Sequence, residues 1–188
     1  QGWKVENGGT GMYYAIKVYD PNETNNQIFL MLKMQPLLKS TAGKAFWQNY
    51  YKLSGNNSQY KVFADAVVLE KPTTEEFYKK FDEIGSYMNS IESTLSTFNF
   101  PKFSNFAKLE ESDSKASMKS VALDSKVLRA TFTGDNGKQG EGMFMASIVN
   151  FGNQYQGGTD MLYYMAYDIM SITSAKDEFI DYKDILLQ

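Results

Sequence analysis

The 188-residue sequence contains neither cysteine nor histidine, and these two absences exclude whole classes of chemistry. Without cysteine the chain has no disulfide, no thiolate nucleophile and no iron–sulfur cluster. Without histidine it has no serine–histidine–aspartate triad and no imidazole ligand for zinc or haem. Any catalysis would depend on Asp, Glu, Lys, Ser, Thr or Tyr side chains. We expect no metal and no cofactor.

Arginine is also scarce, since Arg129 is the only one among 19 basic residues. Arginine is the side chain best suited to grip phosphates and base edges. The formal net charge is −3, and the lysines are unevenly spread. No acidic residue lies between Thr24 and Ala64, a stretch that carries five lysines (Lys33, Lys39, Lys44, Lys52, Lys61). A basic stretch of lysines alone in an acidic chain argues against a nucleic-acid partner.

Long apolar runs are missing too, because no stretch approaches the 18 residues of a transmembrane helix. The first residue is Gln1 rather than methionine, which indicates a processed or trimmed chain. Together with the abundance of Asn, Gln, Ser and Tyr, this favours an exported protein, extracellular or at the cell surface. A lipid anchor upstream is compatible with this interpretation. The alternative is a cytoplasmic domain expressed as a fragment.

The length predicts one globular domain over residues 1–188, without internal repeats or an obvious linker. A chain of this size buries about 70% of its unfolded surface on folding, which is enough for a core without disulfides. Period-two alternation and β-rich runs predict strands at residues 3–5, 12–19, 28–34, 60–69, 121–123, 127–133, 142–151 and 161–172. Capping residues and helical spacing predict helices at 41–53, 74–88 and 174–187.

The connections between these segments favour an α+β fold. Asn136-Gly137 between two apolar runs is a strong hairpin signal, which implies an antiparallel sheet. Residues 96–106 and 110–120 are expected to be turns or loops. We predict a twisted sheet of about six or seven strands with about three helices packed on one or both of its faces, an α/β/α sandwich being one form.

Three motifs that suggest catalysis or ligand binding have simpler explanations. The glycines of Gly8-Gly9-Thr10-Gly11 precede a strand rather than a helix, so they indicate a turn instead of a phosphate loop. Ser112 with Lys115, and Thr41 with Lys44, have the spacing of a lysine-activated nucleophile. Such pairs arise by chance in a chain rich in serine and lysine, but they leave a hydrolase or transferase open as an alternative.

The acidic residues are also better explained as solvated than as catalytic. Asp177, Asp181 and Asp184 would share the solvent side of the last predicted helix. No ladder of calcium ligands surrounds Asp135. Asp168 is the most interesting single acid, because the strand around it is otherwise apolar. It belongs to a site, or it simply points outward or caps a neighbouring element.

Aromatic residues are the strongest compositional anomaly, at 15% of the chain. Tyrosine and tryptophan combine an apolar face with a polar group, which suits contacts with proteins, peptides and glycans. The aromatic residues of segment 41–53 cover more of the helix circumference than a single buried stripe requires. One pair of them could therefore face solvent next to the lysines. The candidate ligand-binding residues are therefore Phe46, Trp47, Tyr50, Tyr51 and Lys44, with Asp168. The competing interpretation places the aromatic residues in the core.

Several segments carry a resemblance to known proteins. Gly2-Trp3-Lys4-Val5, the strand that runs into Asp20-Pro21, and the closing segments Tyr163–Asp168 and Ser174–Phe179 resemble uncharacterised exported proteins and lipoproteins of Gram-positive bacteria. The order of elements is similar to the PsbP/Mog1-type sandwich. The resemblance covers most of the length by pattern, and it implies export and a non-enzymatic role.

The sequence thus predicts a non-catalytic, extracytoplasmic binding or interaction domain for a protein, peptide or glycan. Two alternatives remain open at this stage. One is a hydrolase or transferase that uses carboxylates or a Ser/Lys pair. The other is a structural module of a larger surface protein.

Overall fold

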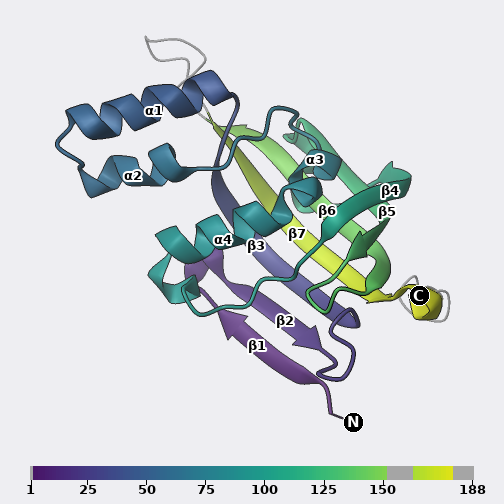
Figure 1. Cartoon of the computed structure of the whole chain (residues 1–188). Helices are drawn as coiled ribbons and strands as arrows, with labels where there is room; N and C mark the ends of the chain where they lie inside the picture. The colour runs from purple at the N-terminus through teal and green to yellow at the C-terminus, as the bar shows by residue number, and fades with distance from the viewer. Residues whose placement is uncertain (1, 152–162, 180–188) are drawn as a thin grey trace.

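Seven antiparallel strands form a single twisted sheet in the order β1-β2-β3-β7-β6-β5-β4 (Figure 1). The computed structural model describes residues 2–151 and 163–179. Each neighbouring pair of strands is antiparallel, and β3 and β7 meet at the centre although they lie far apart in the sequence. The strands are β1 (Lys4–Gly8), β2 (Ala15–Tyr19), β3 (Gln27–Leu38), β4 (Ser104–Asp113), β5 (Asp124–Thr133), β6 (Gln139–Phe151) and β7 (Tyr163–Ala175).

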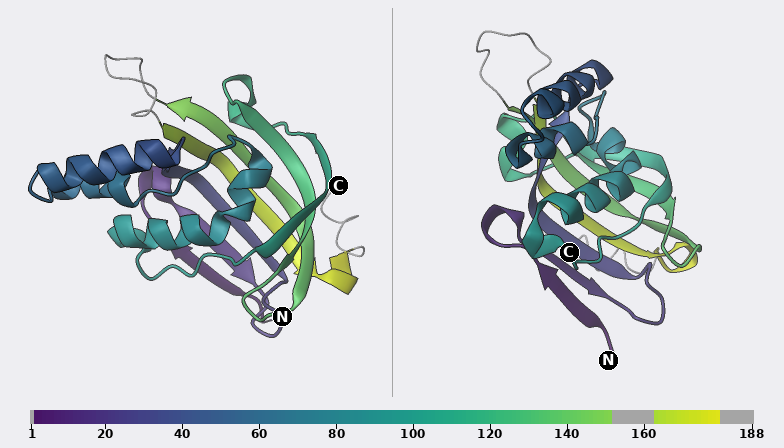
Figure 2. Two further views of the ribbon diagram at one scale, coloured as in Figure 1. Left: turned by 45° about the horizontal axis from the view of Figure 1, so that its top comes forward. Right: turned by 60° about the vertical axis from the view of Figure 1, so that its left-hand side comes forward.

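Four helices lie between β3 and β4 in the chain: α1 (Thr41–Leu53), α2 (Ser58–Asp65), α3 (Thr74–Lys79) and α4 (Phe81–Ile91). Figure 1 shows α3 and α4 across one face of the sheet. Both views of Figure 2 show α1 and α2 as a hairpin that projects beyond the ends of the strands. Short 3-10 segments include η1 (Gly11–Tyr13), η2 (Ser93–Leu95), η3 (Ser117–Ser120) and η5 (Lys176–Glu178). None of the described helices is long and apolar enough to cross a membrane.

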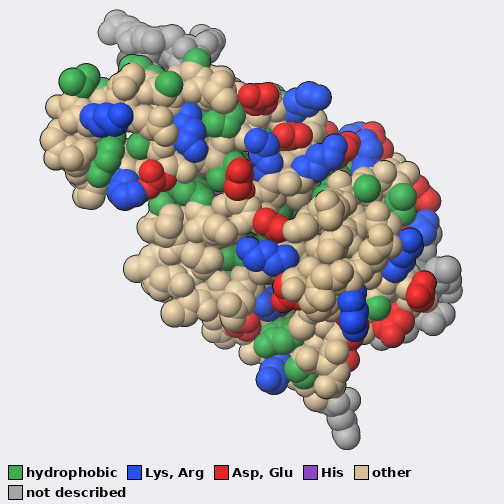
Figure 3. Space-filling model, in the orientation of Figure 1, with side chains coloured by type: hydrophobic (Ala, Val, Ile, Leu, Met, Phe, Trp, Pro, Cys, Tyr) green, Lys and Arg blue, Asp and Glu red, His purple; other side chains and the backbone are tan. Residues whose placement is uncertain are grey.

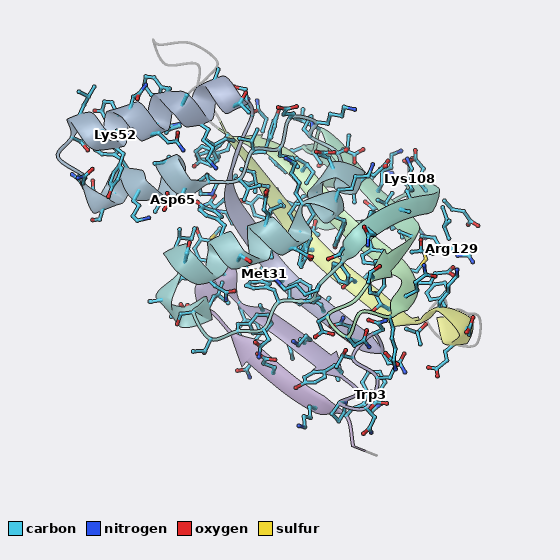
Figure 4. The ribbon with its side chains drawn as sticks, in the orientation of Figure 1. Trp3, Met31, Lys52, Asp65, Lys108 and Arg129 are labelled. Atoms are coloured by element: carbon cyan, nitrogen blue, oxygen red, sulfur yellow. The ribbon has the colours of Figure 1, made fainter. Side chains whose placement is uncertain are left out.

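The core is an aromatic layer between α3–α4 and the sheet. Phe29 on β3 meets Phe81 on α4 edge-to-face at 5.6 Å between ring centroids. Tyr78 on α3 packs in the same way on Phe144 of β6 at 5.0 Å. Met31 of β3, labelled in Figure 4, is only 2% exposed and belongs to the same core. Much of the aromatic excess seen in the sequence is therefore used in this layer.

The α+β prediction with an antiparallel sheet of six or seven strands is confirmed. In the described part of the chain, α3 and α4 cover only one face of the sheet. Similarity to the PsbP/Mog1-type sandwich stays a prediction. The helix at 41–53 and the hairpin around Asn136-Gly137 form where they were predicted.

Several local predictions were wrong. Residues 60–69 are not a strand, since α2 covers 58–65 and only Val68 bridges to the sheet. The Asn57 side chain caps α2 by accepting a hydrogen bond from the N–H of Gln59. The helix predicted at 74–88 is broken at Lys80. Residues 104–113 form an edge strand instead of a loop. β7 continues to Ala175, where a helix was expected, and the rest of that helix, residues 180–187, lies outside the described residues.

Candidate functional site: the open face of the sheet

The face of the sheet turned away from α3 and α4 carries two rows of apolar side chains. Residues paired directly across antiparallel strands share a face, so the pairing register identifies each row. The first row is Ile16, Leu30, Met170, Met145 and Val127. The second row is Val5, Val18, Ile28, Ile172 and Met143. We call these ten side chains the open face.

The open face differs sharply in burial from the face beneath the helices. Leu30 is 42% exposed and Val5 63%, and the other eight side chains are half-buried. Phe29, which precedes Leu30 on β3, is fully buried under α4. The short segments η3 and η5 contact the strands of the sheet, η3 on β5, β6 and β7 and η5 on β6. The centre of this apolar surface therefore faces solvent.

A shallow hollow of about 400 Å³ opens on this face. Four members of the first row, all but Val127, line it, and exposed side chains from β3 and from just before β2 extend it. Its apolar lining includes Tyr14, Ile16, Leu30, Leu32, Met145 and Met170. Asp168 is the one carboxylate in the lining. The hollow is thus shaped by sheet curvature and methionine side chains, and it offers almost no polar partner to a ligand.

Asp168 marks one end of the hollow and is held by η3. Its φ of 51° lies in the left-handed region, at the irregularity where the register between β6 and β7 shifts. Its carboxylate accepts hydrogen bonds from the Ser117 hydroxyl at 3.1 Å and from the Met118 backbone N–H at 3.1 Å. Asp168 therefore fastens η3 to the sheet and also lines the hollow.

A chain of serine hydroxyls continues from Asp168 along the same end of the sheet. Ser147 donates to Asp168 at 3.4 Å, and Ser125 lies 2.8 Å from Ser147. Ser114 completes the chain at 2.5 Å from Ser125. In the described contacts no lysine nitrogen joins this chain, so these serines do not form a lysine-activated nucleophile. The network acts as a polar clamp that closes the edge of the apolar surface.

At the opposite end of the open face, the guanidinium of Arg129 lies over the ring of Phe179. Phe179, just after η5, is 1% exposed and lines a hollow of about 60 Å³ with Trp3, Ile28 and Ile172. The guanidinium of Arg129 lies 5.7 Å from the Phe179 ring centroid (Figure 4). Glu141 and Glu110 hold that guanidinium at 2.5 and 3.0 Å. Charge is thus confined to the borders of the open face.

Two titratable groups near the Asp168 end of the sheet, Lys33 and Tyr167, have shifted pKa values. The Lys33 ammonium lies 5.5 Å from the ring centroid of Tyr167. Burial lowers the pKa of Lys33, and burial, followed by the field of Tyr13, raises the pKa of Tyr167. Both shifts disfavour the charged form, which is the effect of removing water.

The residues singled out from the sequence fall into two separate places. Trp47, Tyr51, Phe46, Tyr50 and Lys44 all lie on α1, while Asp168 lies on β7 at the open face. Trp47 is 8% exposed and stacks on Phe63 of α2 at 4.5 Å, so it belongs to the core of the hairpin. Tyr51 and Lys44 are half-buried, whereas Phe46 and Tyr50 are exposed. The exposed aromatic pair is therefore Phe46 with Tyr50.

A second hollow of about 400 Å³ lies on the other side of the sheet and is polar. Lys17 and Glu6, which both line it, form an ion pair at 3.3 Å. The Lys17 ammonium also donates to the Asn99 carbonyl and lies 5.0 Å from the Tyr19 ring centroid. These contacts pin the loop at Asn99 to β1 and β2. The Lys17 ammonium is thereby used in holding the structure together.

Comparison with known proteins found no family model, no curated protein and no solved structure that matches this chain. The site is therefore interpreted from its own geometry.

Sequence reasoning missed the open face, although a signal for it was present. Residues 28–32 of β3 are apolar at every position. A strand with one wet face alternates between apolar and polar residues, whereas a continuous apolar run indicates that both faces avoid water. Similar runs around Met143–Met145 and Ile169–Met170 occur on β6 and β7. Three adjacent strands with this pattern would have indicated a second apolar face.

Proposed function

We propose that this chain is a non-catalytic interaction domain that binds a partner protein through the open face. The observation that carries the proposal is the pair of uninterrupted apolar rows across five neighbouring strands. At about 4.8 Å between strands, a row of five side chains extends about 20 Å. Contiguous apolar patches of such size are uncommon on monomers and mark interaction sites.

The chemistry of the open face favours an amphipathic helix as the partner element. On the other face of the same sheet, α3 and α4 already show that helices fit its twist. A helix presents apolar side chains at i, i+3, i+4 and i+7, which match the spacing of such rows. Met143, Met145 and Met170 are unbranched and adapt to irregular partner surfaces. A glycan would need the hydrogen-bond partners that this face lacks.

The catalytic alternatives lack an assembled site in the described structure. No group of three acidic side chains is placed to hold a metal ion among the described residues. No described hydrogen bond joins Ser112 to Lys115 or Thr41 to Lys44. Asp168 accepts hydrogen bonds from Ser117, Ser147 and the Met118 N–H, and in the described contacts no lysine joins them. The extracytoplasmic location expected from the sequence remains part of the proposal, as does the alternative of a structural module.

The test uses a dye and a peptide that recognise apolar surfaces. We expect the wild-type protein to enhance the fluorescence of 1-anilinonaphthalene-8-sulfonate and to bind a designed amphipathic Leu/Lys helical peptide. The double variant Leu30→Gln, Met170→Gln should reduce both signals by more than half, because it places two amides at the centre of the open face. Its free energy of unfolding should stay within about 1.5 kcal/mol of the wild type, since Leu30 is already half exposed in the free protein.

The matched control is Leu109→Gln, because Leu109 is 51% exposed on the edge strand β4 and lies outside the open face. This variant should bind the dye and the peptide as the wild type does. Loss of both signals in the control, or unchanged signals in the double variant, would contradict the proposal. A wild-type protein that neither enhances the dye fluorescence nor binds the peptide would also contradict the proposal.

A further inference from the structure

We propose that the α1–α2 hairpin binds the surface of an anionic lipid bilayer, independently of the open face. The hairpin projects from the body of the molecule, so it can reach a flat surface without hindrance from the sheet (Figure 2). Three properties of the hairpin support this assignment: an exposed apolar stripe, a packed aromatic scaffold beneath it, and an excess of positive charge.

The apolar stripe runs along α1 and consists of Phe46, Tyr50 and Leu53. Positions i, i+4 and i+7 lie on one side of a helix. The three side chains are 39%, 42% and 87% exposed. The Phe46 and Tyr50 rings stack at 6.1 Å with an interplanar angle of 18°, and Leu53 ends the helix. The stripe thus leads to the tip of the hairpin.

The scaffold beneath the stripe is already packed. Trp47 stacks on Phe63 at 4.5 Å, and Tyr50 meets Tyr60 edge-to-face at 4.8 Å. The Ser40 hydroxyl caps α1 by accepting from the Gly43 N–H at 3.0 Å. The stripe therefore needs no rearrangement before binding. Tyr50 contributes to the packing of α1 on α2, and the exposed parts of Phe46, Tyr50 and Leu53 remain available to a surface.

The hairpin has more basic residues than acidic ones. Lys44, Lys52 and Lys61 are its basic residues, and Asp65 is its one carboxylate. Asp65 pairs with Lys61 within α2, and no ion pair in the described structure engages Lys44 or Lys52. Figure 3 shows blue side chains over the hairpin, with one red side chain beside a blue one. Lys52 and Asp65 are labelled in Figure 4, on different helices.

Charge complementarity selects an anionic surface, and the size of the stripe selects a bilayer over an acidic protein. A stable protein interface buries about 800 Å² on each partner, which three side chains on one helix do not supply. A bilayer interface needs only an apolar face that enters the headgroup boundary and lysines that reach lipid phosphates. Tyrosine and long lysine stems are suited to that boundary. Each lysine near an anionic surface strengthens binding about fivefold.

The experiment is co-sedimentation of the full chain with large unilamellar vesicles of phosphatidylcholine alone or with about 30 mol% phosphatidylglycerol, a fraction chosen to give a negative surface potential. We expect binding to the anionic vesicles, weak binding to the neutral ones, and release at high salt because salt screens the lysines. Leu53→Ser should lower the partition coefficient about tenfold, since it removes the most exposed apolar side chain. The double variant Lys44→Gln, Lys52→Gln should lower it on anionic vesicles only.

Two controls keep the inference falsifiable. Leu109→Ser, far from the hairpin on β4, should bind vesicles as the wild type does. The open-face double variant should also bind them normally, so failure here and failure of the proposed function are distinguishable. Absence of binding to anionic vesicles, or binding that Leu53→Ser leaves unchanged, would overturn the inference. Binding of the hairpin to soluble polyglutamate but not to vesicles would assign it to an acidic protein partner instead.

Discussion

At the scale of single residues, Tyr78 ties the helical layer to the centre of the sheet. Its side chain is fully buried, and its single O–H proton is shared between the carbonyl oxygens of Met145 at 2.7 Å and Met170 at 2.8 Å from the hydroxyl oxygen. Burial raises the pKa of Tyr78 well above its ordinary value. The same two methionines present their side chains on the open face, so Tyr78 supports the site from behind.

We therefore predict that Tyr78→Phe lowers the free energy of unfolding by about 1–3 kcal/mol, because buried carbonyls lose their partner. Urea denaturation followed by circular dichroism measures the change. Tyr14→Phe is the control, since Tyr14 is 42% exposed, and it should alter stability by less than about 0.5 kcal/mol. Equal effects of the two substitutions would show that the Tyr78 hydroxyl does not tie the two layers together.

At the scale of elements, the α1–α2 hairpin has its own small aromatic core. Trp47, Phe63 and Tyr60 stack between the two helices, with 4.5 Å between the Trp47 and Phe63 rings. Phe46, next to Trp47 in the chain, lies on the outside of the same helix. The helix spacing of 3.6 residues per turn separates these two neighbours by about 100°, so one is core and the other surface.

Trp47→Ala should lower the free energy of unfolding by about 3 kcal/mol or more, as for other buried large-to-small changes. Phe46→Ala should change it by less than about 1 kcal/mol. Thermal unfolding monitored by circular dichroism distinguishes the two. A small effect at Trp47 would place this side chain on the binding surface, as the sequence first allowed.

At the scale of the whole molecule, the two faces of the sheet differ: α3 and α4 cover one of them, and the other is the open face. The helix-bearing face buries Phe29, Phe144 and Leu128 under α3 and α4. The other face presents apolar rows bounded by the Asp168 clamp and by Arg129 over Phe179. Charged groups are thus kept to the borders of the open face, which is the arrangement of an interface core with a polar rim.

Neighbouring residues on β3 test this asymmetry directly. Phe29→Ala should cost about 3–5 kcal/mol of stability, because it opens a cavity in the aromatic layer. Leu30→Ala should cost about 1 kcal/mol or less in the free protein, since Leu30 is 42% exposed. Chemical denaturation of the two variants measures both values. If Leu30→Ala proved as costly as Phe29→Ala, the open face would have to be covered in solution.

Some features were determined by the sequence alone, because they depend on local chemistry. The absence of cysteine and histidine excludes thiol and imidazole chemistry in any fold. Ser40 and the spacing of Trp47 with Tyr51 define α1, and Asn136-Gly137 sets the β5–β6 hairpin. These signals act within a few residues, so no tertiary information is needed to interpret them.

Other features were decided only by the tertiary structure. Residues 58–65 combine β-rich character with a capping Asn57, and the stacking of Phe63 on Trp47 favours the helix. The alternation of Phe29 and Leu30 shows that they face opposite ways, but only the placement of α3 and α4 decides which of them is buried. The open face exists because Met143–Met145 and Met170 are brought beside Leu30 by pairings between strands that lie far apart in the chain. Such long-range register is a property of the assembled sheet, and local sequence cannot contain it.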